Sequence, residues 1–580
     1  MRQAIPLPLL LLVGLTALAQ QPPTGTPSEK IYLHTDRAEY VAGETVWLRA
    51  YLTEAARHTP AAVSQTVHLN LLSPTGRVVD FQTLQLAHGS ASGQFRLPDT
   101  LRTGTYSLVA HTQWMRNFDE AFFFRKTLTV WGRNVQPLPT ASAQTGQPDL
   151  QFFPEGGHLV QGLLSRVAFK ALDASGHGLA VRGRILDDLG QPVTEFATAH
   201  QGMGLLTLTP QRRYHALVEH RGQTLRYDLP VPLSEGHVLT VDNLRSKTGI
   251  VVQVASNQPK AGQKLHLFAH LRGQQVFEAT LDGGKAASNL LVPAEALPGE
   301  GIVHVTLFDG RHRPLAERLV YAGWGQQQLG VQVEADRAGY GPRQAVTLTV
   351  RATDASGQPQ AARLSLAVTD GGQVMAPEAE GRSLPGYLLL ESDLKGHIAQ
   401  PGYYFDATNA QKRLHLDYLL MTQGWRRFTW QQVLAETPQT PQFLPERGIS
   451  LQGRAFRNKK PAGKTELKVT LKTGSGLAQT EVVTDGEGRF TLPDLPLSDS
   501  TTVVVDSRDN RYVRVEWEPR FTPALHSVPT GNESSPVYNA ALLEKSTQAR
   551  QQAGVVDWLD GTTLAEVKVR ARKLDPLKND

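Results

Sequence analysis

The sequence contains no cysteine and only 5 methionines in 580 residues. Without cysteine the chain forms no disulfide, holds no zinc through thiolates and cannot carry the usual bacterial lipid anchor, which needs a cysteine at the cleavage site. Long apolar runs are also missing, because no stretch reaches the ~20 apolar residues of a membrane-spanning helix. We therefore expect a soluble or peripherally attached protein whose stability comes from its folded cores.

A short targeting segment occupies residues 1–19. Arg2 precedes an apolar run from Leu9 to Leu15, and Ala17-Leu18-Ala19 form a small-x-small cleavage site. We predict a signal peptide that ends at residue 19, a mature chain that begins at Gln20, and export of the protein.

The net charge and the number of turn-forming residues narrow the class of protein further. The net charge of +5 is small for this length, and lysine and arginine are spread along the chain without a dominant basic block. Nucleic acid is therefore not an expected partner, despite a pI near 9.2. The 51 glycines and 36 prolines favour an all-β chain, because both residues punctuate strands and are unfavourable inside helices.

An internal repeat organises the chain. The segment KIYLHTDRAEYVAGETVWLRAYL at 30–52 is matched by VQVEADRAGYGPRQAVTLTVRAT at 331–353. Each copy predicts a strand, a turn and a second strand that alternates apolar and polar residues. We predict that the two copies superimpose, with equivalent turn positions for Tyr40 and Tyr340 and equivalent inward positions for Val46/Val346 and Leu48/Leu348.

Strand signals recur every eight to twelve residues along most of the chain, which is the spacing of β-sandwiches. The predicted segments are a signal peptide at 1–19, sandwich domains at 28–135, 150–232, 237–325 and 329–446, a further strand-rich domain at 448–518, and a mostly disordered tail at 524–580. In the first domain, Tyr106 is at the position where a tyrosine fastens the corner of such sandwiches.

The period changes inside the unit at 329–446. An alternating strand is predicted at 363–370, RLSLAVTD, and is followed by residues at helical intervals. These residues are Leu416, Leu419, Leu420 and Gln423. A partly helical insertion near 376–446 is therefore predicted, with its helix ending near Gly424. The fold class is all-β, with tandem immunoglobulin-like sandwiches and this one insertion.

The first repeat copy resembles the opening of the MG2 domain of α2-macroglobulin-like proteins, through its Tyr-x-x-Gly-x-x-Val turn between two strands. Within that superfamily the chain is most similar to large envelope proteins of gram-negative bacteria. These join macroglobulin-like domains to a carboxypeptidase-regulatory-like domain and often to a TonB-receptor plug, which this sequence lacks. The resemblance implies an MG2 domain at 28–135 and macroglobulin-like domains at 150–232 and 329–446. The segment TDGEGRF at 484–490 resembles the mark of the regulatory-like domain and implies that domain at 448–518.

The resemblance does not extend to the chemistry of protease-trapping macroglobulins, because their thioester motif requires a cysteine. It implies a non-catalytic scaffold or binding protein in the periplasm or at the outer membrane, with an envelope protein or polysaccharide as partner. Two alternatives stay open. One is an accessory component of a TonB-dependent outer-membrane transport system, with the receptor as partner, and the other is a non-covalent protease inhibitor.

One pair of motifs resembles an active site. Ser392-Asp393-Leu394-Lys395 and Lys472-Thr473-Gly474 match two of the three signatures of serine β-lactamases. The third signature, Ser-Asp-Asn, is absent, a second Lys-Thr-Gly begins at Lys247, and the surrounding sequence does not predict the α/β fold that such a nucleophile needs. We therefore predict no catalytic residue and no enzyme.

Metal and cofactor sites are not predicted either. No His-Glu-x-x-His motif occurs, and a five-residue offset places His215 and His220 on opposite faces of a strand. Asp485 and Glu487 offer only two of the six or more oxygen ligands that Ca²⁺ takes. We expect Asp485 to cap a turn instead.

Two segments are candidates for partner binding. The aromatic and basic run WRRFTW at 425–430 is either a binding patch through cation–π contacts or a packing surface, and packing is favoured. The tail segment LAEVKVRAR at 564–572 resembles the link between a regulatory-like domain and a TonB-receptor plug, and it alternates like an edge strand that awaits a partner sheet. The predicted partner-binding residues are Leu564, Glu566, Val567 and Val569, and the alternative is a tail without a role.

Overall fold

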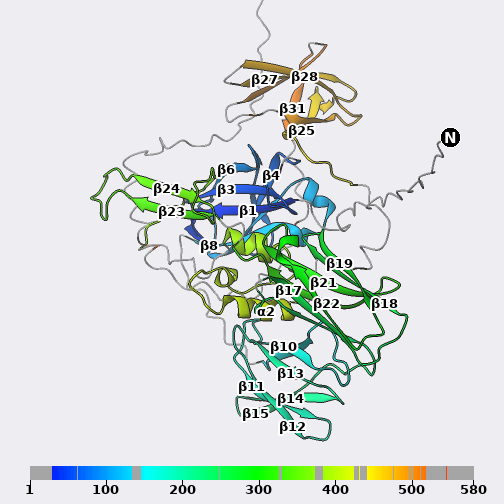
Figure 1. Ribbon diagram of the computed structural model, residues 1–580. Helices are drawn as coiled ribbons and strands as arrows, with labels where there is room; N and C mark the ends of the chain where they lie inside the picture. The colour runs from blue at the N-terminus through cyan, green and yellow to red at the C-terminus, as the bar shows by residue number, and fades with distance from the viewer. Residues whose placement is uncertain are drawn as a thin grey trace, which may run out of the picture.

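The computed structural model describes residues 29–517, except 62, 133–145, 247, 326–328, 372–382, 424–429, 431–440, 474–475, 496, 498–500 and 510, together with residues 525, 542 and 544. The predicted signal peptide, most of the WRRFTW run and the tail segment at 564–572 lie outside the described residues. Figure 1 shows a series of β-sandwiches, so the all-β fold class is confirmed.

The first sandwich packs a three-stranded sheet on a five-stranded sheet. The strand order of the three-stranded sheet is β1 (Glu29–Thr35), β3 (Thr45–Glu54), β6 (Ser90–Arg96). The strand order of the five-stranded sheet is β2 (Glu39–Val41), β8 (Phe124–Trp131), β7 (Gly104–His111), β4 (Thr66–Leu72), β5 (Val78–Gln85). Two short 3-10 turns, η1 (Trp114–Asn117) and η2 (Glu120–Phe122), precede β8. Tyr106 fastens the corner as predicted, because its buried hydroxyl donates to the Arg102 carbonyl across 3.0 Å.

The second and third sandwiches each pair a three-stranded with a four-stranded antiparallel sheet. The second has the orders β13 (Met203–Leu208), β10 (Ser165–Leu172), β9 (Asp149–Pro154), and β12 (Pro192–Ala197), β11 (Arg182–Asp187), β14 (Tyr214–His220), β15 (Gln223–Asp228). The third has the orders β16 (His237–Asp242), β17 (Gly249–Ser256), β20 (Ala287–Pro293), and β19 (Gln274–Asp282), β18 (Lys264–Leu271), β21 (Gly301–Asp309), β22 (Pro314–Ala322), with the turn η3 (Ala294–Ala296) after β20.

The last sandwich is drawn in orange in Figure 1, apart from the other three. One of its sheets has the strand order β26 (Lys460–Pro461), β25 (Ile449–Arg457), β29 (Arg489–Leu495), and β31 (Arg514–Trp517) also pairs with β25. The other sheet has the strand order β28 (Gly476–Val483), β27 (Glu466–Thr473), β30 (Thr502–Ser507). Phe490 enters its core, as expected for the strand after the TDGEGRF turn. Asp485 caps that turn by accepting from the backbone N–H groups of Glu487 and Arg489, at 2.9 and 2.8 Å.

Residues 384–423 form a compact segment that we call the cap. It contains α1 (Leu384–Gly386), the π-helical turn η4 (Tyr387–Glu391), η5 (Pro401–Tyr404) and α2 (Lys412–Thr422). The α2 helix ends just before Gly424, as predicted. The cap buries Leu416 and Leu419 against Met203 of the second sandwich and Leu319 of the third. The predicted helical insertion therefore packs between sandwiches far away in the sequence.

The second repeat copy forms only a two-stranded sheet, β23 (Gly330–Ala335) and β24 (Leu348–Thr353), which we call the ribbon. The sequence predicts a full sandwich over 329–446 and a strand at 363–370. Among the described residues of that range, no second sheet covers the ribbon, and residues 363–370 form no strand. The reason is that a period of two specifies one apolar face but does not specify what covers it. No helix in the described part of the chain is long and apolar enough to cross a membrane.

Candidate functional site

The turn of the first repeat copy is organised by one carboxylate. Asp36 Oδ1 accepts a hydrogen bond from the Tyr40 hydroxyl across 2.7 Å and another from the Trp47 backbone N–H across 2.9 Å. Tyr40 is fully buried, and burial, followed by the nearby charge of Asp36, raises its pKa well above the ordinary value. The hydroxyl is therefore a permanent donor that fixes the connection between β1 and β3.

The second copy repeats this turn in the same geometry. The Tyr340 hydroxyl donates to Asp336, which also accepts from the Thr347 backbone N–H across 3.0 Å. Strand register is repeated as well, because Leu33 lies opposite Ala50 in the first copy and Val333 lies opposite Val350 in the second. The equivalence predicted for Tyr40 and Tyr340 is confirmed.

The predicted inward positions differ between the copies. Val46 and Leu48 are 0% and 6% exposed in the first sandwich, whereas Val346 is 53% exposed and Leu348 is only half-buried. The first pair is covered by the five-stranded sheet of its own sandwich. The prediction that Val346 and Leu348 point into a core is therefore wrong, because the ribbon has no opposing sheet among the described residues.

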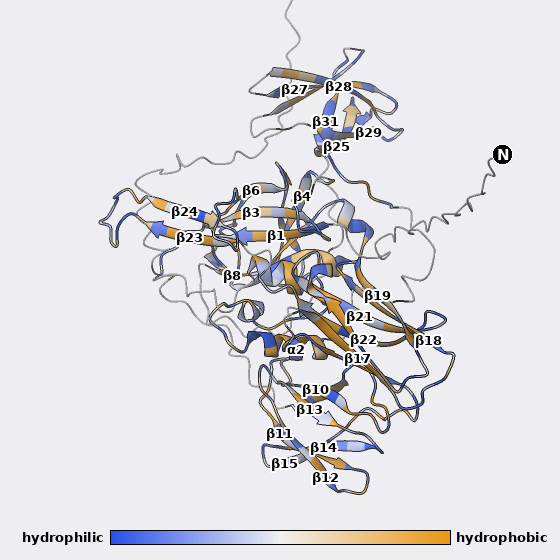
Figure 2. Cartoon of the chain, viewed as in Figure 1, coloured by the Kyte–Doolittle hydropathy of each residue, from blue (hydrophilic) through white to orange (hydrophobic). Residues whose placement is uncertain are grey.

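The uncovered face of the ribbon is apolar. Directly opposed residues of an antiparallel pair share a face, so Val331, Val333 and Val350 lie together, at 47%, 50% and 41% exposure. Figure 2 shows hydrophobic residues on both strands. The other face carries polar residues, including Glu334 and Arg351, whose side chains approach to 3.3 Å. The ribbon is thus an amphipathic sheet with its apolar side exposed.

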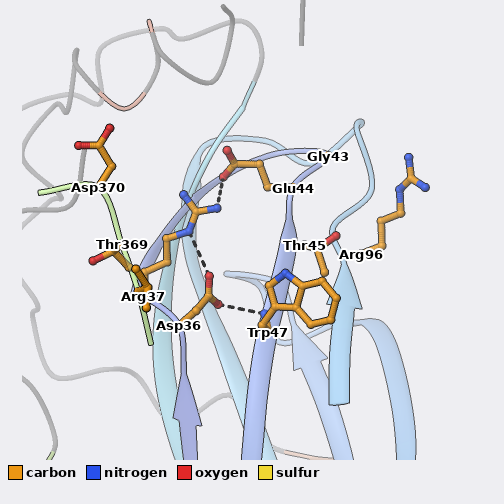
Figure 3. A pocket seen from close by; sticks show the side chains of 10 residues that line it. Asp36, Arg37, Gly43, Glu44, Thr45, Trp47, Arg96, Thr369 and Asp370 are labelled. Atoms are coloured by element: carbon orange, nitrogen blue, oxygen red, sulfur yellow. Dashed lines mark hydrogen bonds and ion pairs between the residues drawn. The ribbon is translucent and has the colours of Figure 1, made fainter. Parts of the chain in front are cut away.

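A cavity of about 520 Å³ lies between the first turn and the end of the segment at 363–370 (Figure 3). Its lining residues are Asp36, Arg37, Gly43, Glu44, Thr45, Trp47, Arg96, Val368, Thr369 and Asp370. Arg37 is held between two carboxylates, at 3.5 Å from Asp36 and 3.1 Å from Glu44. The lining offers hydrogen-bonding groups, with three carboxylates among them, and the indole of Trp47, which is 41% exposed.

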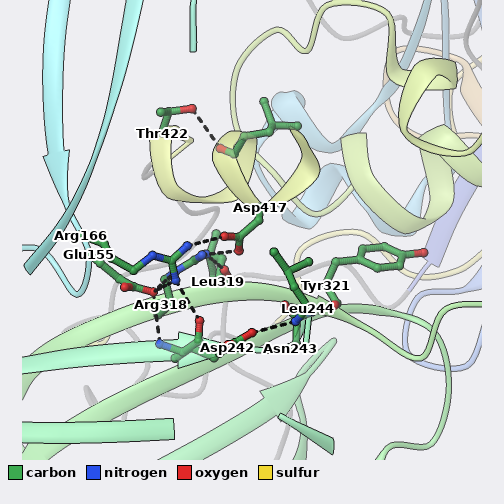
Figure 4. Close-up of polar contacts among 12 residues, drawn as sticks. Glu155, Arg166, Asp242, Asn243, Leu244, Arg318, Leu319, Tyr321, Asp417 and Thr422 are labelled. Atoms are coloured by element: carbon green, nitrogen blue, oxygen red, sulfur yellow. Dashed lines mark hydrogen bonds and ion pairs between the residues drawn. The ribbon is translucent and has the colours of Figure 1, made fainter. Parts of the chain in front are cut away.

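A buried ion-pair network fixes the cap to the second and third sandwiches (Figure 4). Arg318 of β22 donates to Glu155 Oε1 across 2.9 Å and also donates to Asp417 of α2. Arg166 of β10 reaches the same two carboxylates, at 3.3 and 2.8 Å. Burial lowers the pKa of Arg318, but the charges of Asp417 and Glu155 outweigh that effect and raise it. The Arg318 guanidinium therefore stays charged, and the four side chains together hold the cap, the second sandwich and the third sandwich in contact.

A second polar joint fixes the cap to the first sandwich. Lys30 of β1 donates to Asp393 Oδ1 across 2.6 Å and to the Leu388 carbonyl across 3.2 Å. Burial raises the pKa of Asp393, but the ammonium of Lys30 outweighs it and holds the pKa below the ordinary value. Arg272 of the third sandwich also lowers that pKa, and its side chain donates to the Ala56 carbonyl across 2.7 Å. Sequence reasoning missed both joints, although Asp417 on the apolar face of α2 was a local signal.

The β-lactamase-like residues are not brought together as a catalytic site. Ser392 is buried in the cap and donates its hydroxyl hydrogen to the Leu388 carbonyl across 3.0 Å. Lys472 lies in β27 of the last sandwich. Within the described residues, no hydrogen bond or ion pair joins the two. The Ser392 hydroxyl thus bonds to the backbone of the preceding turn within the cap.

Three further residues singled out in the sequence, His215, His220 and Trp430, are described in the structure. His215 and His220 lie on β14 with opposite orientations, and no group of three or more metal-ligating side chains occurs among the described residues. Trp430 packs edge-on against Phe308, with ring centroids 4.9 Å apart, and its indole N–H donates to Glu317 across 2.9 Å. The packing interpretation therefore holds for Trp430.

Comparison with known proteins assigns the first sandwich. Residues 30–125 match the MG2 domain model, and no curated protein matches the chain. Among solved structures, the chain is similar to Salmonella α2-macroglobulin reacted with methylamine, with 11% identity, TM-score 0.16, and coverage of 86% of this chain and 40% of that one. It is also similar to Escherichia coli α2-macroglobulin activated by porcine elastase, with 11% identity, TM-score 0.21, and coverage of 85% and 53%. The E. coli adhesin FdeC matches 52% of this chain over 98% of its own, at 14% identity and TM-score 0.14.

The chain spans about half or less of the length of the α2-macroglobulins that it matches. The fold and the sequence match together define an all-β protein of tandem sandwiches. Its first sandwich is an MG2 domain, so the resemblance seen in the first repeat copy is confirmed. The regulatory-like assignment of residues 448–518 stays a prediction.

Proposed function

We propose that this chain is an exported, non-catalytic binding protein of the bacterial envelope, which presents the ribbon to a protein partner. The observation that carries the proposal is the exposed apolar face of the ribbon, whose register-matched twin in the MG2 domain is buried. Monomeric soluble proteins rarely leave a contiguous apolar patch of this kind uncovered, and such patches mark interaction sites.

The rest of the structure supports a scaffold. The cap joins the first three sandwiches through the two buried polar joints and a shared apolar cluster, so it holds them in one arrangement. Beside this body, the Ser365 hydroxyl hydrogen-bonds with His34 of β1 across 2.6 Å, which positions the segment that follows the ribbon. The ribbon is thus presented on a fixed support.

Affinity capture from envelope extract tests the proposal. We expect the wild-type chain to retain a partner protein that the Val333→Asp variant loses, because a carboxylate on the apolar face cannot be buried without a partner charge. Thr349→Asp is the matched control, since it places the same charge on the polar face of β24. Equal capture by all three chains would contradict the assignment of the ribbon.

The captured protein also separates the finer alternatives. An outer-membrane barrel would identify a transport accessory, and a protease whose rate falls when the chain is present would identify a non-covalent inhibitor. The absence of catalysis is tested separately by incubating the chain with peptides, esters and β-lactams. Turnover that the Ser392→Ala variant abolishes would overturn the non-catalytic part of the proposal.

A further inference from the structure

The apolar face of the ribbon has an internal two-fold pattern. A two-fold axis can be drawn perpendicular to the sheet, through the centre of the Val333–Val350 pair. Rotation by 180° about this axis exchanges the two antiparallel strands, so each residue of β23 takes the place of the residue 17 positions later in β24. The exchanged residues on this face are similar in size. The pairs are Val331 with Leu348, Val333 with Val350, and Ala335 with Ala352.

This pattern gives the face a definite relief. Val331 lies opposite Ala352 at one end of the ribbon, and Ala335 lies opposite Leu348 at the other. The large side chains therefore form a diagonal ridge through the central Val333–Val350 pair, and an alanine leaves a notch at each of the two remaining corners. The register-matched face of the first sandwich has no such arrangement, because Leu52 and Leu48 occupy both ends of β3.

A face with a diagonal ridge complements a second copy of itself. Turning one ribbon over onto another reverses the diagonal, so the two ridges cross at their centres. The ends of each ridge then lie over the alanine notches of the other copy, which is the alternation of large and small side chains that well-packed layers show. A self-complementary patch of this kind is what a two-fold symmetric dimer requires.

We propose that two copies of this chain associate through their ribbons, apolar face to apolar face, to form one composite sandwich. The inference rests on the proposed function and names the partner as a second copy. Charge is compatible with it, because Glu334 and Arg351 lie on the opposite face and stay in solvent when the apolar faces meet. No charged side chain of β23 or β24 has to be desolvated.

The size of the face sets the strength of the dimer. Six-residue strands are about 20 Å long and neighbouring strands are about 4.8 Å apart, so the contact falls well below the ~800 Å² per partner of a standard interface. We therefore expect a weak dimer whose population depends on protein concentration.

Sedimentation velocity of the chain purified from Gln20 onward, over a concentration series, tests the dimer. We expect self-association in the wild type, at least a tenfold weaker association in Val333→Asp, and no change in Thr349→Asp. Ala352→Leu is the decisive variant, because it fills a notch. Specific packing predicts weaker association in this variant, whereas unspecific apolar adhesion predicts stronger association and would overturn the proposal.

Cross-linking gives an independent readout, because the natural chain has no cysteine. Val333→Cys and Val350→Cys variants are oxidised separately and mixed. We expect a covalent dimer in at least one of these samples, since the central pairs of the two copies face each other. Thr349→Cys should stay monomeric. A monomeric chain in every sample and at every concentration would overturn the inference.

The proposed binding function and the proposed dimer can each be contradicted without the other. A chain that is monomeric, but that captures a different protein in a Val333-dependent manner, would retain the binding function and remove the second copy as partner. Deletion of residues 556–580 distinguishes another occupant. If the truncated chain dimerises while the full chain does not, the tail covers the ribbon and the inference fails for the intact protein.

Discussion

The hydroxyl of Tyr40 donates a hydrogen bond to the carboxylate of Asp36 across 2.7 Å, inside the MG2 domain. The same bond recurs between Tyr340 and Asp336 on the exposed ribbon. One turn motif thus occurs in two environments in a single chain, one buried and one in solvent. Comparing the two turns therefore measures how much burial changes the contribution of this hydrogen bond to the free energy of unfolding.

Tyr40→Phe should destabilise the MG2 domain by about 1.5 to 3 kcal/mol, because it removes a buried hydrogen bond to a charged group. Tyr340→Phe removes the equivalent bond in solvent and should cost less than about 0.5 kcal/mol. Urea unfolding followed by tryptophan fluorescence measures both. Equal losses would show that the turn stabilises the chain by geometry alone, independently of burial.

Arg318→Met should destabilise the joint between the cap and the sandwiches by about 3 kcal/mol or more, because Glu155 and Asp417 lose a buried cation. The exposed pair of Arg351 with Glu334 provides the comparison, since Arg351→Met should cost less than about 0.5 kcal/mol. Thermal unfolding and limited proteolysis of the cap report the difference. An intact cap in the Arg318→Met variant would contradict the role given to this network.

His111 makes stability depend on pH. Its imidazole is buried, and burial, followed by the nearby charge of His68, lowers its pKa from 6.5 to about 3. The unfolded chain therefore takes up the proton first as the pH falls. The contribution is fully present above pH 6.5 and is lost towards pH 3, with a loss of about 2 kcal/mol by pH 5. In a His111→Gln variant, the free energy of unfolding should differ less between pH 7 and pH 5 than it does in the wild type. The same difference in both chains would refute this.

Gly202→Ala should severely destabilise the second sandwich. Gly202 has a φ of +74°, and an added Cβ would lie 2.1 Å from the Ala171 carbonyl oxygen. Gly222 has a similar φ of +79° but open space around it, so Gly222→Ala isolates the backbone cost of about 1 to 2 kcal/mol. We expect the Gly202 variant to lose clearly more in the same unfolding experiment. Similar losses would mean that the neighbouring strand moves aside.

The sequence predicted what depends on local pattern. Alternation at Val46 and Leu48 identified the buried face of β3, and helical spacing placed α2 and its end near Gly424. The ribbon shows where this reasoning stops, because Val333 has the same alternation as Leu33 but no cover among the described residues. Arg318 and Asp417 are 99 positions apart, and no local pattern links such a pair. Long-range contacts of this kind decide how the sandwiches are joined.

The core of the MG2 domain includes Tyr387 and Leu388 of the cap, and Lys30 of its first strand bonds a carbonyl 358 positions further along the chain. Leu542 is buried against Val41 and Trp131 of the same domain. A ribosome that adds about 5 to 20 residues per second needs roughly 20 to 70 s to travel from Lys30 to Leu388. The MG2 domain is therefore completed only after the cap has been synthesised, and the part of its core that Tyr387 and Leu388 fill stays open throughout that interval.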